Sequence, residues 1–400
     1  MNREEPSSRN AWRRVNVEDV CTAVSVGIVV QPTQYYVAAE DGVRAFRSAN
    51  VGENTIIDRD WVYLSLDGHQ ANSKSALQTG DVLVVRSGAP GTACVVTDQY
   101  AGSNCIDIVF ARPRPTEVIS EYLAEFTNSP VGKRHVLGMQ GGLALQHFNV
   151  GAYKKLELLL PSLSEQQEIV DLLAAWDAAI ETTQRLIAAK NQLLSHLREH
   201  HLTKPQQSKR IKLKAATHES TARNGKRLGR EAIMAVTKQV GMRPMREETI
   251  AAAIDRYKVV RPQAFAYNPM RLNIGSIAMS SFDDDVLVSP DYVVFECNEE
   301  KLLPGYLNHL RRTRLWASHF EAAGSGGVRI RIYYDDLGAF TFPLPPLAEQ
   351  TRVLAVLDAG VAEIETLERY LAALKTQKRG LMQKLLTGQW RVNLDRPEAR

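Results

Sequence analysis

The sequence predicts an α+β protein with an internal pseudo-twofold repeat, in which two mixed α/β globular units are separated by two long antiparallel helices forming a coiled-coil spacer. Three observations predict this fold. The chain has 400 residues, more than a single domain of roughly 150 residues uses. One segment recurs at a constant offset, and both copies carry a heptad spacing of apolar residues. With 44% hydrophobic and 24% charged residues, the composition is typical of a globular protein and excludes wholesale disorder.

The repeat is clearest at its start. Residues 160–166, Leu-Pro-Ser-Leu-Ser-Glu-Gln, recur as Leu-Pro-Pro-Leu-Ala-Glu-Gln at 344–350, an offset of 184. The similarity continues without a gap, with 17 identities across the 44 positions from 160 to 203. The same offset aligns Tyr122 with Tyr306 further upstream. The repeated unit is therefore a globular domain followed by a helix.

Each copy of the repeated segment predicts a helix of some 35 residues, about 50 Å long. Lys190 interrupts the first apolar seam and Lys378 the second. Ser164 and Gln167 have the spacing of a capping box, and Gly388 suits the end of the second helix. An ordinary core-facing stripe is an equal alternative for one such helix, but two copies favour a paired coil. We expect an antiparallel pair, because that arrangement places the globular units at opposite ends.

The globular units are expected to alternate short strands, helices and glycine-rich turns. Residues typical of strands lie at 81–86, 105–110, 285–288 and 292–296. Helices are expected near 118–128 and 304–316. Turns are expected at 86–91, 138–142 and 324–327. Each unit is thus predicted to be a scaffold that presents loops.

No coherent catalytic constellation is found. Asn268-Pro269-Met270 begins like the motif with which adenine methyltransferases hold a flipped base, but the second proline and the aromatic residue are missing. Asp291 and the run 299–301 have the residue types of a nuclease centre, and a turn followed by a solvated loop explains them better. The sequence contains neither a G-x-x-x-x-G-K-[ST] phosphate loop nor an H-E-x-x-H metal motif. A binding protein is therefore expected.

Cysteines, termini and charge bear on the compartment and on partners. The 4 cysteines lie far apart without a C-x-x-C pair, and we expect them to be reduced and structural. No apolar run reaches the roughly 18 residues of a membrane span, and the start lacks the apolar core of a secretory signal. The net charge is only +4, but the stretch 204–230 holds nine basic residues against one acid. That stretch either attracts phosphate or is a solvated linker, two alternatives of equal weight.

Together these features resemble the specificity (S) subunit of type I restriction–modification systems, over nearly the whole chain. The resemblance lies in the repeated Leu-Pro-x-Leu-x-Glu-Gln opening, the heptad helix that follows it, and the ending Leu385–Gly388. Segments 80–88 and 289–295 are similar to parts of that family's target recognition domains. The resemblance implies target recognition domains over 1–160 and 204–344, conserved spacer helices over 161–203 and 345–388, and a C-terminal tail over 389–400. The first helix departs from the family in lacking the final glycine, since Lys204 follows Thr203.

The resemblance implies a non-catalytic DNA-binding subunit of a phage-defence complex that reads one bipartite, asymmetric site in double-stranded DNA. It further implies two modification (methyltransferase) subunits and two restriction subunits as partners, in the cytoplasm of a prokaryote and without a membrane. S-adenosylmethionine, ATP and Mg²⁺ would then be bound by the partners, and this chain would hold no cofactor or metal of its own. The rival interpretations are a self-contained restriction–modification enzyme and a coiled-coil adaptor without a DNA role.

Candidate contact residues are chosen by their chemistry. Arg and Lys suit phosphate or guanine, Asn and Gln suit adenine, and Ser in a glycine-rich loop suits phosphate. The DNA-binding candidates are Arg86, Ser87, Arg112, Lys133, Arg134 and Gln140 in the first domain and Tyr267, Asn268, Arg271, Ser325, Arg329 and Arg331 in the second. The candidates for the spacer and partner interface are Glu165, Gln166, Ile169, Leu173, Trp176, Ile180, Glu349, Gln350, Val353, Leu357, Ile364 and Leu371. The exposed faces of both helices would dock the modification subunits, with the Glu-Gln pairs at their starts.

Overall fold

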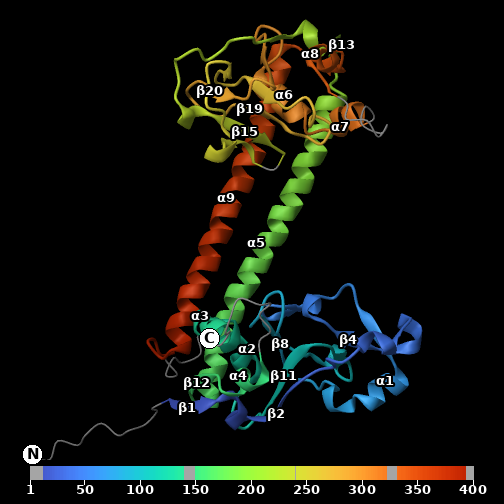
Figure 1. The fold of residues 1–400 in the computed structure, drawn as a ribbon, viewed down its shortest axis with the longest axis vertical. Helices are drawn as coiled ribbons and strands as arrows, with labels where there is room; N and C mark the ends of the chain where they lie inside the picture. The colour runs from blue at the N-terminus through green and yellow to red at the C-terminus, as the bar shows by residue number, and fades with distance from the viewer. Residues whose placement is uncertain (1–11, 139–148, 239, 322–330, 393–400) are drawn as a thin grey trace, which may run out of the picture. The chain divides into compact units, whose positions relative to one another are not determined.

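A computed structural model describes residues 12–138, 149–238, 240–321 and 331–392. The chain forms two compact units, which are described separately. Unit 1 comprises residues 1–183 and 370–400, and unit 2 comprises residues 184–369. The border between the units falls inside both long helices, α5 (Leu163–Thr203) and α9 (Leu347–Leu386), which are green and red in Figure 1. The expected limits of the target recognition domains stay predictions.

Each unit is built on a four-stranded antiparallel sheet with one strand order. In unit 1 the order is β2 (Cys21–Val26), β11 (Ile108–Pro113), β8 (Val82–Val85) and β9 (Ala93–Val95). In unit 2 it is β14 (Thr217–Glu219), β21 (Val293–Cys297), β18 (Phe265–Tyr267) and β19 (Ile277–Met279). The last three strands of each sheet match at the offset of 184. The sequence repeat therefore extends into the sheets.

The units differ in the strands outside these sheets. Unit 1 adds a sheet of β10 (Asn104–Cys105), β4 (Gly42–Phe46), β7 (Val62–Ser65) and β3 (Tyr36–Val37), the hairpin β5 (Val51–Gly52) with β6 (Thr55–Ile56), and helix α1 (Leu66–Ala71). Unit 2 instead has two pairs, β15 (Met234–Thr237) with β16 (Gly241–Pro244), and β17 (Lys258–Val260) with β20 (Val286–Val288). The repeated scaffold thus carries different peripheral structure in each half.

A two-stranded ribbon precedes each long helix. In unit 1, β1 (Arg13–Asn16) pairs with β12 (Glu157–Leu160), and in unit 2, β13 (Lys209–Lys212) pairs with β22 (Thr341–Leu344). The short helices are α2 (Ser120–Asn128), α3 (Pro130–Gly138) and α4 (Val150–Lys154) in unit 1, and α6 (Pro304–Leu310), α7 (Arg314–Glu321) and α8 (Tyr334–Gly338) in unit 2. Helices α2 and α6 occupy corresponding positions of the repeat.

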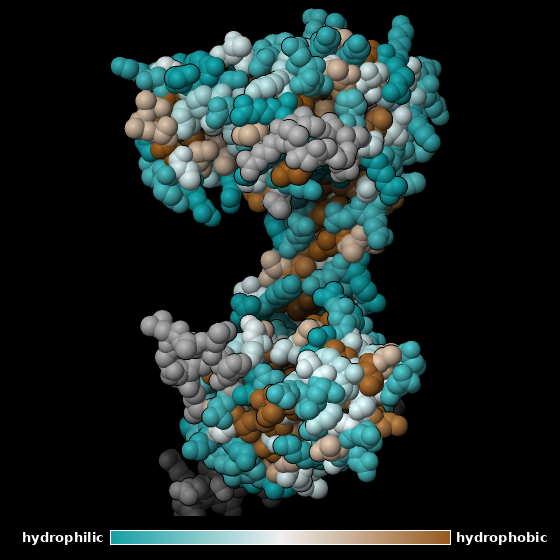
Figure 2. Space-filling model, turned by 45° about the vertical axis from the view of Figure 1, so that its right-hand side comes forward, coloured by the Kyte–Doolittle hydropathy of each residue, from teal (hydrophilic) through white to brown (hydrophobic). Residues whose placement is uncertain are grey.

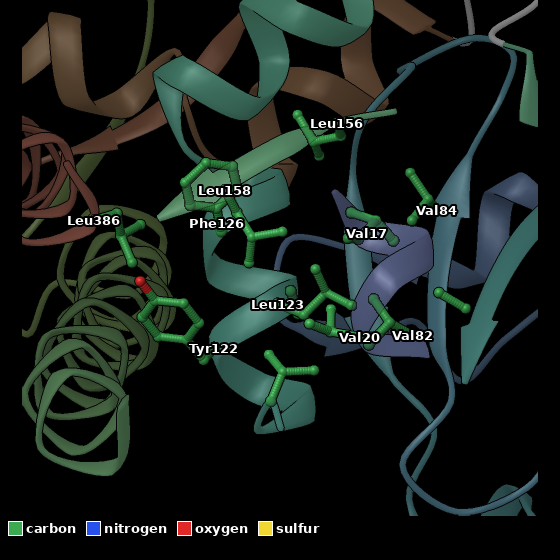
Figure 3. Packing of buried hydrophobic residues seen from close by; sticks show 14 of the residues in the cluster. Val17, Val20, Val82, Val84, Tyr122, Leu123, Phe126, Leu156, Leu158 and Leu386 are labelled. Atoms are coloured by element: carbon green, nitrogen blue, oxygen red, sulfur yellow. The ribbon is translucent and has the colours of Figure 1, made fainter. Parts of the chain in front are cut away.

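Helices α2 and α6 join the sheets to the long helices through the core. In unit 1, Tyr122, Leu123 and Phe126 of α2 are buried with Val82 and Val84 of β8 and with residues of α5 and α9 (Figure 3). In unit 2, the stacked rings of Phe265 and Phe295 lie 5.1 Å apart and share a core with Tyr306 of α6 and Leu357 of α9. Apolar burial therefore fixes each sheet to its stretch of the helix pair.

The long helices pack together in antiparallel fashion. In unit 1 Asp177 of α5 pairs with Lys378 of α9, with 2.7 Å between the carboxylate oxygen and Nζ. In unit 2 Lys190 of α5 pairs with Glu363 of α9 at 2.7 Å. Also in unit 2, Leu194 further along α5 lies beside Gly360 earlier on α9, where a Cβ would be 3.2 Å from Leu194. The helices therefore run in opposite directions. The two lysines that interrupt the seams are thus accommodated by ion pairs with the opposite helix.

Three local predictions are wrong in detail. The strand expected at 105–110 is split into β10 and β11 by Asp107, whose φ is 50°. The helix expected at 304–316 is split into α6 and α7. The Thr313 hydroxyl donates to the carbonyl of Leu310, the last residue of α6, at 2.7 Å and so caps the end of that helix. The first long helix is capped by Ser162 rather than Ser164, since the Glu165 N–H donates to the Ser162 Oγ at 3.3 Å.

Candidate nucleic-acid interface

Three segments of unit 2 converge beside the end of β18. The loop 268–275 follows β18 directly, and the Ile332 N–H donates to the Pro269 carbonyl at 3.1 Å, which brings the segment at 331–333 to this loop. The Ser276 hydroxyl donates to the Val236 carbonyl at 2.9 Å and so attaches the far end of the loop to the hairpin β15–β16. These backbone contacts create one loop cluster from three distant parts of the sequence.

The loop cluster of unit 2 carries exposed basic side chains. Arg271 and Arg331 are both exposed, and Arg331 donates to the Tyr333 hydroxyl at 3.4 Å. Asn268 accepts the Met270 N–H at 2.9 Å, a bond that closes the turn. Three of the predicted candidates, Asn268, Arg271 and Arg331, are therefore brought together.

The hairpin adds two exposed basic residues that the sequence analysis missed, Lys238 and Arg243. The Lys238 side chain lies against Gly275, where a Cβ would be 3.4 Å from it. The signal available in the sequence was a pair of basic residues on either side of Gly241, a glycine with a φ of 77° that permits the tight hairpin. Positive charges near one another and on loops suit phosphate contacts.

Unit 1 has a corresponding loop after β8, the strand that matches β18. This loop, 86–91, packs against α3, because a Cβ on Gly91 would lie 3.3 Å from Val136. Helix α3 carries the candidates Lys133 and Arg134, and Arg134 is exposed. Lys133 pairs with Glu53, and Arg86 pairs with Asp107. Arg86, Ser87, Lys133 and Arg134 thus share one region, in which two of the cations have carboxylate partners.

Two candidates are held within the fold: Tyr267 is buried, and Arg112 is half-buried in an ion pair. Tyr267 is 0% exposed in the core of unit 2, and its hydroxyl has no hydrogen-bond partner among the described residues. Arg112 donates from Nε and Nη2 to the two oxygens of Asp81, both at 2.8 Å, and the Asp81 side chain is fully buried. The burial of Tyr267 corrects its prediction as a DNA contact, whereas the DNA contact of Arg112 stays a prediction. Gln140, Ser325 and Arg329 lie outside the described residues.

No metal or membrane feature is found in the ranges that the structure describes. Within them, no group of three His, Cys, Asp or Glu side chains could hold a metal ion. Nor does any described helix combine the length and apolar character needed to cross a membrane. The four cysteines are free thiols, three of them buried, and burial raises the pKa of the Cys94 thiol to about 12.

Comparison with known proteins identifies the class of protein that this chain is similar to. No family model matches it. It is 22% identical over 322 residues to the type I restriction enzyme StySPI specificity subunit of Salmonella potsdam, an alignment spanning 70% of this chain and 68% of that protein. The chain resembles a type I specificity subunit. The resemblance stated from the sequence is thereby confirmed.

Solved structures agree in fold. A chain from a type I R-M system, described for its complex assembly and conformational transition, has a TM-score of 0.60 and 17% identity over 95% of this chain and 98% of that one. The type I restriction-modification system S subunit from M. genitalium has a TM-score of 0.51 and 10% identity, covering 96% of this chain and 98% of that one. The predicted fold of mixed α/β units with two long paired helices is confirmed.

The Glu-Gln pairs of this specificity-subunit fold have an internal role. Gln166 is 0% exposed: its Oε1 accepts the Ile119 N–H at 2.8 Å, and its Nε2 donates to the carbonyls of Glu117 and Pro161 at 3.1 and 3.0 Å. Gln350 repeats all three bonds at the offset of 184, with the Leu303 N–H at 2.9 Å and the carbonyls of Lys301 and Pro345 at 2.8 and 2.9 Å. We call each set of three bonds a glutamine clasp.

The clasps differ from the expectation that the Glu-Gln pairs lie on exposed helix faces. Glu165 is also buried, and it accepts hydrogen bonds from the Trp12 Nε1 at 3.0 Å and from Arg391 at 2.6 and 2.9 Å. Only Glu349 among the four is partly exposed. Among the seam candidates, Ile169, Leu173, Val353, Leu357 and Ile364 are buried, whereas Trp176, Ile180 and Leu371 are half-buried. Their contacts hold the helices and domains together.

Proposed function

We propose that this chain is the non-catalytic, sequence-reading subunit of a type I restriction–modification complex. It would read a bipartite, asymmetric site in double-stranded DNA, one half with each target recognition domain. The observation that carries the proposal is a repeated scaffold with two non-identical loop clusters after equivalent strands, β8 and β18. Equivalent strands with different loops suit a protein that recognises two different half-sites.

The charges of unit 2 support DNA binding by its loop cluster. Lys238, Arg271 and Arg331 are exposed cations on segments joined by the contacts described above. Further exposed cations lie in the basic stretch, including Lys209, Arg210, Lys212 and Lys214 on and after β13. Other members of that stretch already have carboxylate partners, as Arg227 has with Asp285 at 3.1 Å and Arg230 with Glu247 at 2.7 Å. The loop cluster and the β13 ribbon are therefore the favoured phosphate-binding surfaces.

DNA binding is tested with the full chain and a labelled duplex by fluorescence anisotropy, between about 50 and 200 mM salt. The triple variant K238A, R271A and R331A should reduce the slope of log affinity against log salt by about three, one for each lost phosphate contact. The matched control R352A, K375A and R379A removes three exposed charges from α9 and should leave the slope unchanged. Affinity that does not depend on salt would favour the adaptor interpretation.

We also propose that two modification subunits dock on apolar residues that repeat on the outer faces of the long helices. Leu172 and Leu186 of α5 are 38% and 42% exposed, and their equivalents at the offset of 184, Val356 and Tyr370 of α9, are 52% and 54% exposed. Hydrophobic residues along the helical segments are visible in Figure 2. Isolated exposed apolar residues are ordinary, but recurrence at the repeat offset favours two equivalent docking positions for two copies of one partner.

Docking is tested by co-purification with the modification subunit and mass measurement by light scattering. Wild type should bind two copies, whereas L172E with L186E, or V356E with Y370E, should bind one. The control Q184A with E368A changes other faces of the same helices and should bind two. Retention of both copies by the fourfold variant would contradict this docking surface.

The proposal assigns the chemistry to the partners. S-adenosylmethionine would be held by the modification subunits, and ATP with Mg²⁺ by the restriction subunits. The purified chain alone is expected to transfer no methyl group from labelled S-adenosylmethionine to DNA, and addition of the modification subunit should restore transfer. Methylation by the chain alone would favour the self-contained enzyme.

A further inference from the structure

Three arginines of unit 2 converge where α5 meets the end of α6. Arg198 lies on α5, and Arg311 and Arg312 directly follow α6. His309 joins them, because its Nδ1 faces the Arg198 Nε at 3.1 Å and its carbonyl accepts the Arg312 N–H at 3.0 Å. We call Arg198, Arg311 and Arg312 the arginine cluster. All of its residues belong to unit 2, so the cluster is formed by one unit alone.

The arginine cluster lacks ion pairs, since none of its members has a carboxylate partner among the described residues. The Arg311 Nε donates to the neutral side-chain oxygen of Asn308 at 2.9 Å. Arg198 donates to the His309 Nδ1, and the other ring nitrogen of His309 faces Asp358 at 2.8 Å. Guanidinium groups stay charged at neutral pH. The cluster therefore brings together three positive charges without ion pairs.

The arginine cluster is unfavourable for the folded chain alone. Arg198 and Arg311 are half-buried, whereas Arg312 is exposed. Burial, with the charge of Arg312 as the next cause, lowers the pKa of Arg198 to about 10 and that of Arg311 to about 9. Like charges without a partner raise the free energy of the folded state. An anion held by the exposed guanidinium of Arg312 would counter this repulsion.

Unit 1 has neutral residues at the equivalent positions. At the offset of 184 the arginine cluster corresponds to Met382, Thr127 and Asn128. The Thr127 hydroxyl donates to the Leu123 carbonyl at 2.7 Å. The Asn128 side chain bonds to the N–H and the carbonyl of Ala93, both at 2.9 Å. Neutral side chains thus satisfy the same positions, and three cations are not a requirement of the repeated scaffold.

The arginine cluster adjoins the loop cluster of unit 2. Helix α6 packs against β19, the strand that follows the loop 268–275 (Figure 1). In unit 1 the contact of Asn128 with Ala93 connects the end of α2 to the first residue of β9. Because α6 and β19 are the equivalents of α2 and β9, the end of α6 lies at the start of β19. The loop cluster is attached at that same end of the strand.

We propose that the arginine cluster binds phosphates of the DNA that the loop cluster reads, so that α5 itself contributes to DNA binding in unit 2. This inference rests on the proposed DNA-reading function. Guanidinium groups can donate two parallel hydrogen bonds to phosphate oxygens. Contacts of this kind hold a duplex in register without reading its sequence.

The alternative counter-charge is an acidic surface of the modification subunit. The two proposed docking positions of that partner are equivalent in the repeat, whereas the positions equivalent to the arginine cluster in unit 1 are neutral. An asymmetric DNA site needs no second copy of the cluster. The asymmetry therefore favours DNA.

The test is fluorescence anisotropy of the full chain with a labelled duplex, between about 50 and 200 mM salt. The affinity of the wild-type chain should fall as salt rises. R198Q with R312Q should reduce the slope of log affinity against log salt by about two, one for each lost phosphate contact. The matched control R369Q with K375Q removes two exposed charges from α9 and should leave the slope unchanged.

The thermal unfolding midpoint without DNA separates a binding role from a structural one. Arg312 is exposed and makes no side-chain hydrogen bond to a described residue, so R312Q removes repulsion without removing such a contact. It should raise the midpoint by about 2 °C. An arginine that stabilises the fold would give a lower midpoint when it is replaced.

The outcomes distinguish this inference from the proposed function. Salt-independent affinity of the wild-type chain would overturn both. Salt-dependent binding that R198Q with R312Q leaves unchanged would overturn only the role of the arginine cluster, and so would a midpoint that R312Q lowers. Loss of the modification subunit by the double variant, with an unchanged slope, would overturn the phosphate contact and assign the cluster to that partner.

Discussion

The joints between the globular part of each unit and the helix pair are alike in backbone contacts and unlike in the ionisable residues buried beside them. Gln166 and Gln350 make the same three hydrogen bonds. At the same offset of 184, Glu125 of α2 corresponds to His309 of α6. Each is buried and has a partner from α9, which is Lys378 for Glu125 and Asp358 for His309. The repeat thus maintains backbone geometry and accepts either an acidic or a basic residue at this position, provided that α9 supplies a partner.

Removing either glutamine clasp should have the largest effect on the free energy of unfolding, and the two effects should be nearly equal. Gln166→Ala and Gln350→Ala should each lower the free energy of unfolding by about 3 kcal/mol, because each leaves three backbone groups without a partner. Gln167→Ala, which removes only an exposed bond to Asp171, should cost less than about 0.5 kcal/mol. Urea denaturation measures all three. Strongly unequal costs for the two clasp variants would break the equivalence of the joints.

The seam lysines should differ from each other. Lys378→Met should lower the free energy of unfolding by about 2 kcal/mol, because Lys378 is buried and its loss leaves Glu125 and Asp177 uncompensated. Lys190→Met breaks an ion pair whose side chains are 31% and 51% exposed, and it should cost less than about 0.5 kcal/mol. The same denaturation experiment distinguishes them, and equal costs would contradict the account.

A tyrosine pair offers a comparison at one hydroxyl. Tyr122 donates to the Leu159 carbonyl at 2.8 Å, whereas the hydroxyl of its equivalent, Tyr306, is buried without a partner among the described residues. Tyr122→Phe should lower the free energy of unfolding by about 1 kcal/mol, and Tyr306→Phe should change it by less than about 0.5 kcal/mol or raise it. A larger cost for the second variant would mean that Tyr306 has a partner.

The smallest effect is a pH dependence of opposite sign in the two joints. Burial raises the pKa of the Glu125 carboxyl, against the opposing charge of Lys378. The folded state therefore holds the proton more tightly than the unfolded state, and this contribution to stability is lost as pH rises above the ordinary value of about 4.5. Glu125→Gln should remove that decline, as measured by thermal unfolding across pH.

His309 should behave in the reverse way. Burial lowers the pKa of its imidazole, Asp358 opposes that effect, and Arg198 and Arg312 reinforce it. The unfolded state then binds the proton more tightly, so stability is complete above the ordinary pKa of about 6.5 and is lost as pH falls below it. His309→Gln should flatten this decline. Slopes of the same sign in the two joints would contradict the comparison.

The sequence predicts those features that have a periodic or repeated pattern. Apolar spacing predicted the long helices and their burial at Leu173 and Leu357, and the constant offset predicted two equivalent units. The clasps could not be predicted in this way, because Gln166 bonds to backbone groups that carry no residue signature. Arg112 was interpreted as a surface cation, since its partner Asp81 lies 31 residues away and only the β8–β11 pairing brings them together.

The loop cluster of unit 2 was predicted only in part, because contacts between distant segments leave no pattern in the sequence. Residue chemistry selected Asn268, Arg271 and Arg331, but the hairpin residue Lys238 joins them only through the contact at Gly275. Tyr267 immediately precedes the loop, yet it is the last residue of β18 and its side chain points into the core. Successive side chains of a strand point to opposite faces of the sheet, and the choice of residues by chemistry does not tell these faces apart.

The central claim is that two loop clusters read two half-sites. The most direct measurement is to co-express the chain with its modification subunit and map methylated bases across a genome by single-molecule sequencing. Wild type should produce methylation at one split, asymmetric motif. The variant K238A, R271A and R331A should relax one half of that motif and leave the other intact. A stable complex without a motif, or a variant that alters both halves together, would contradict the account.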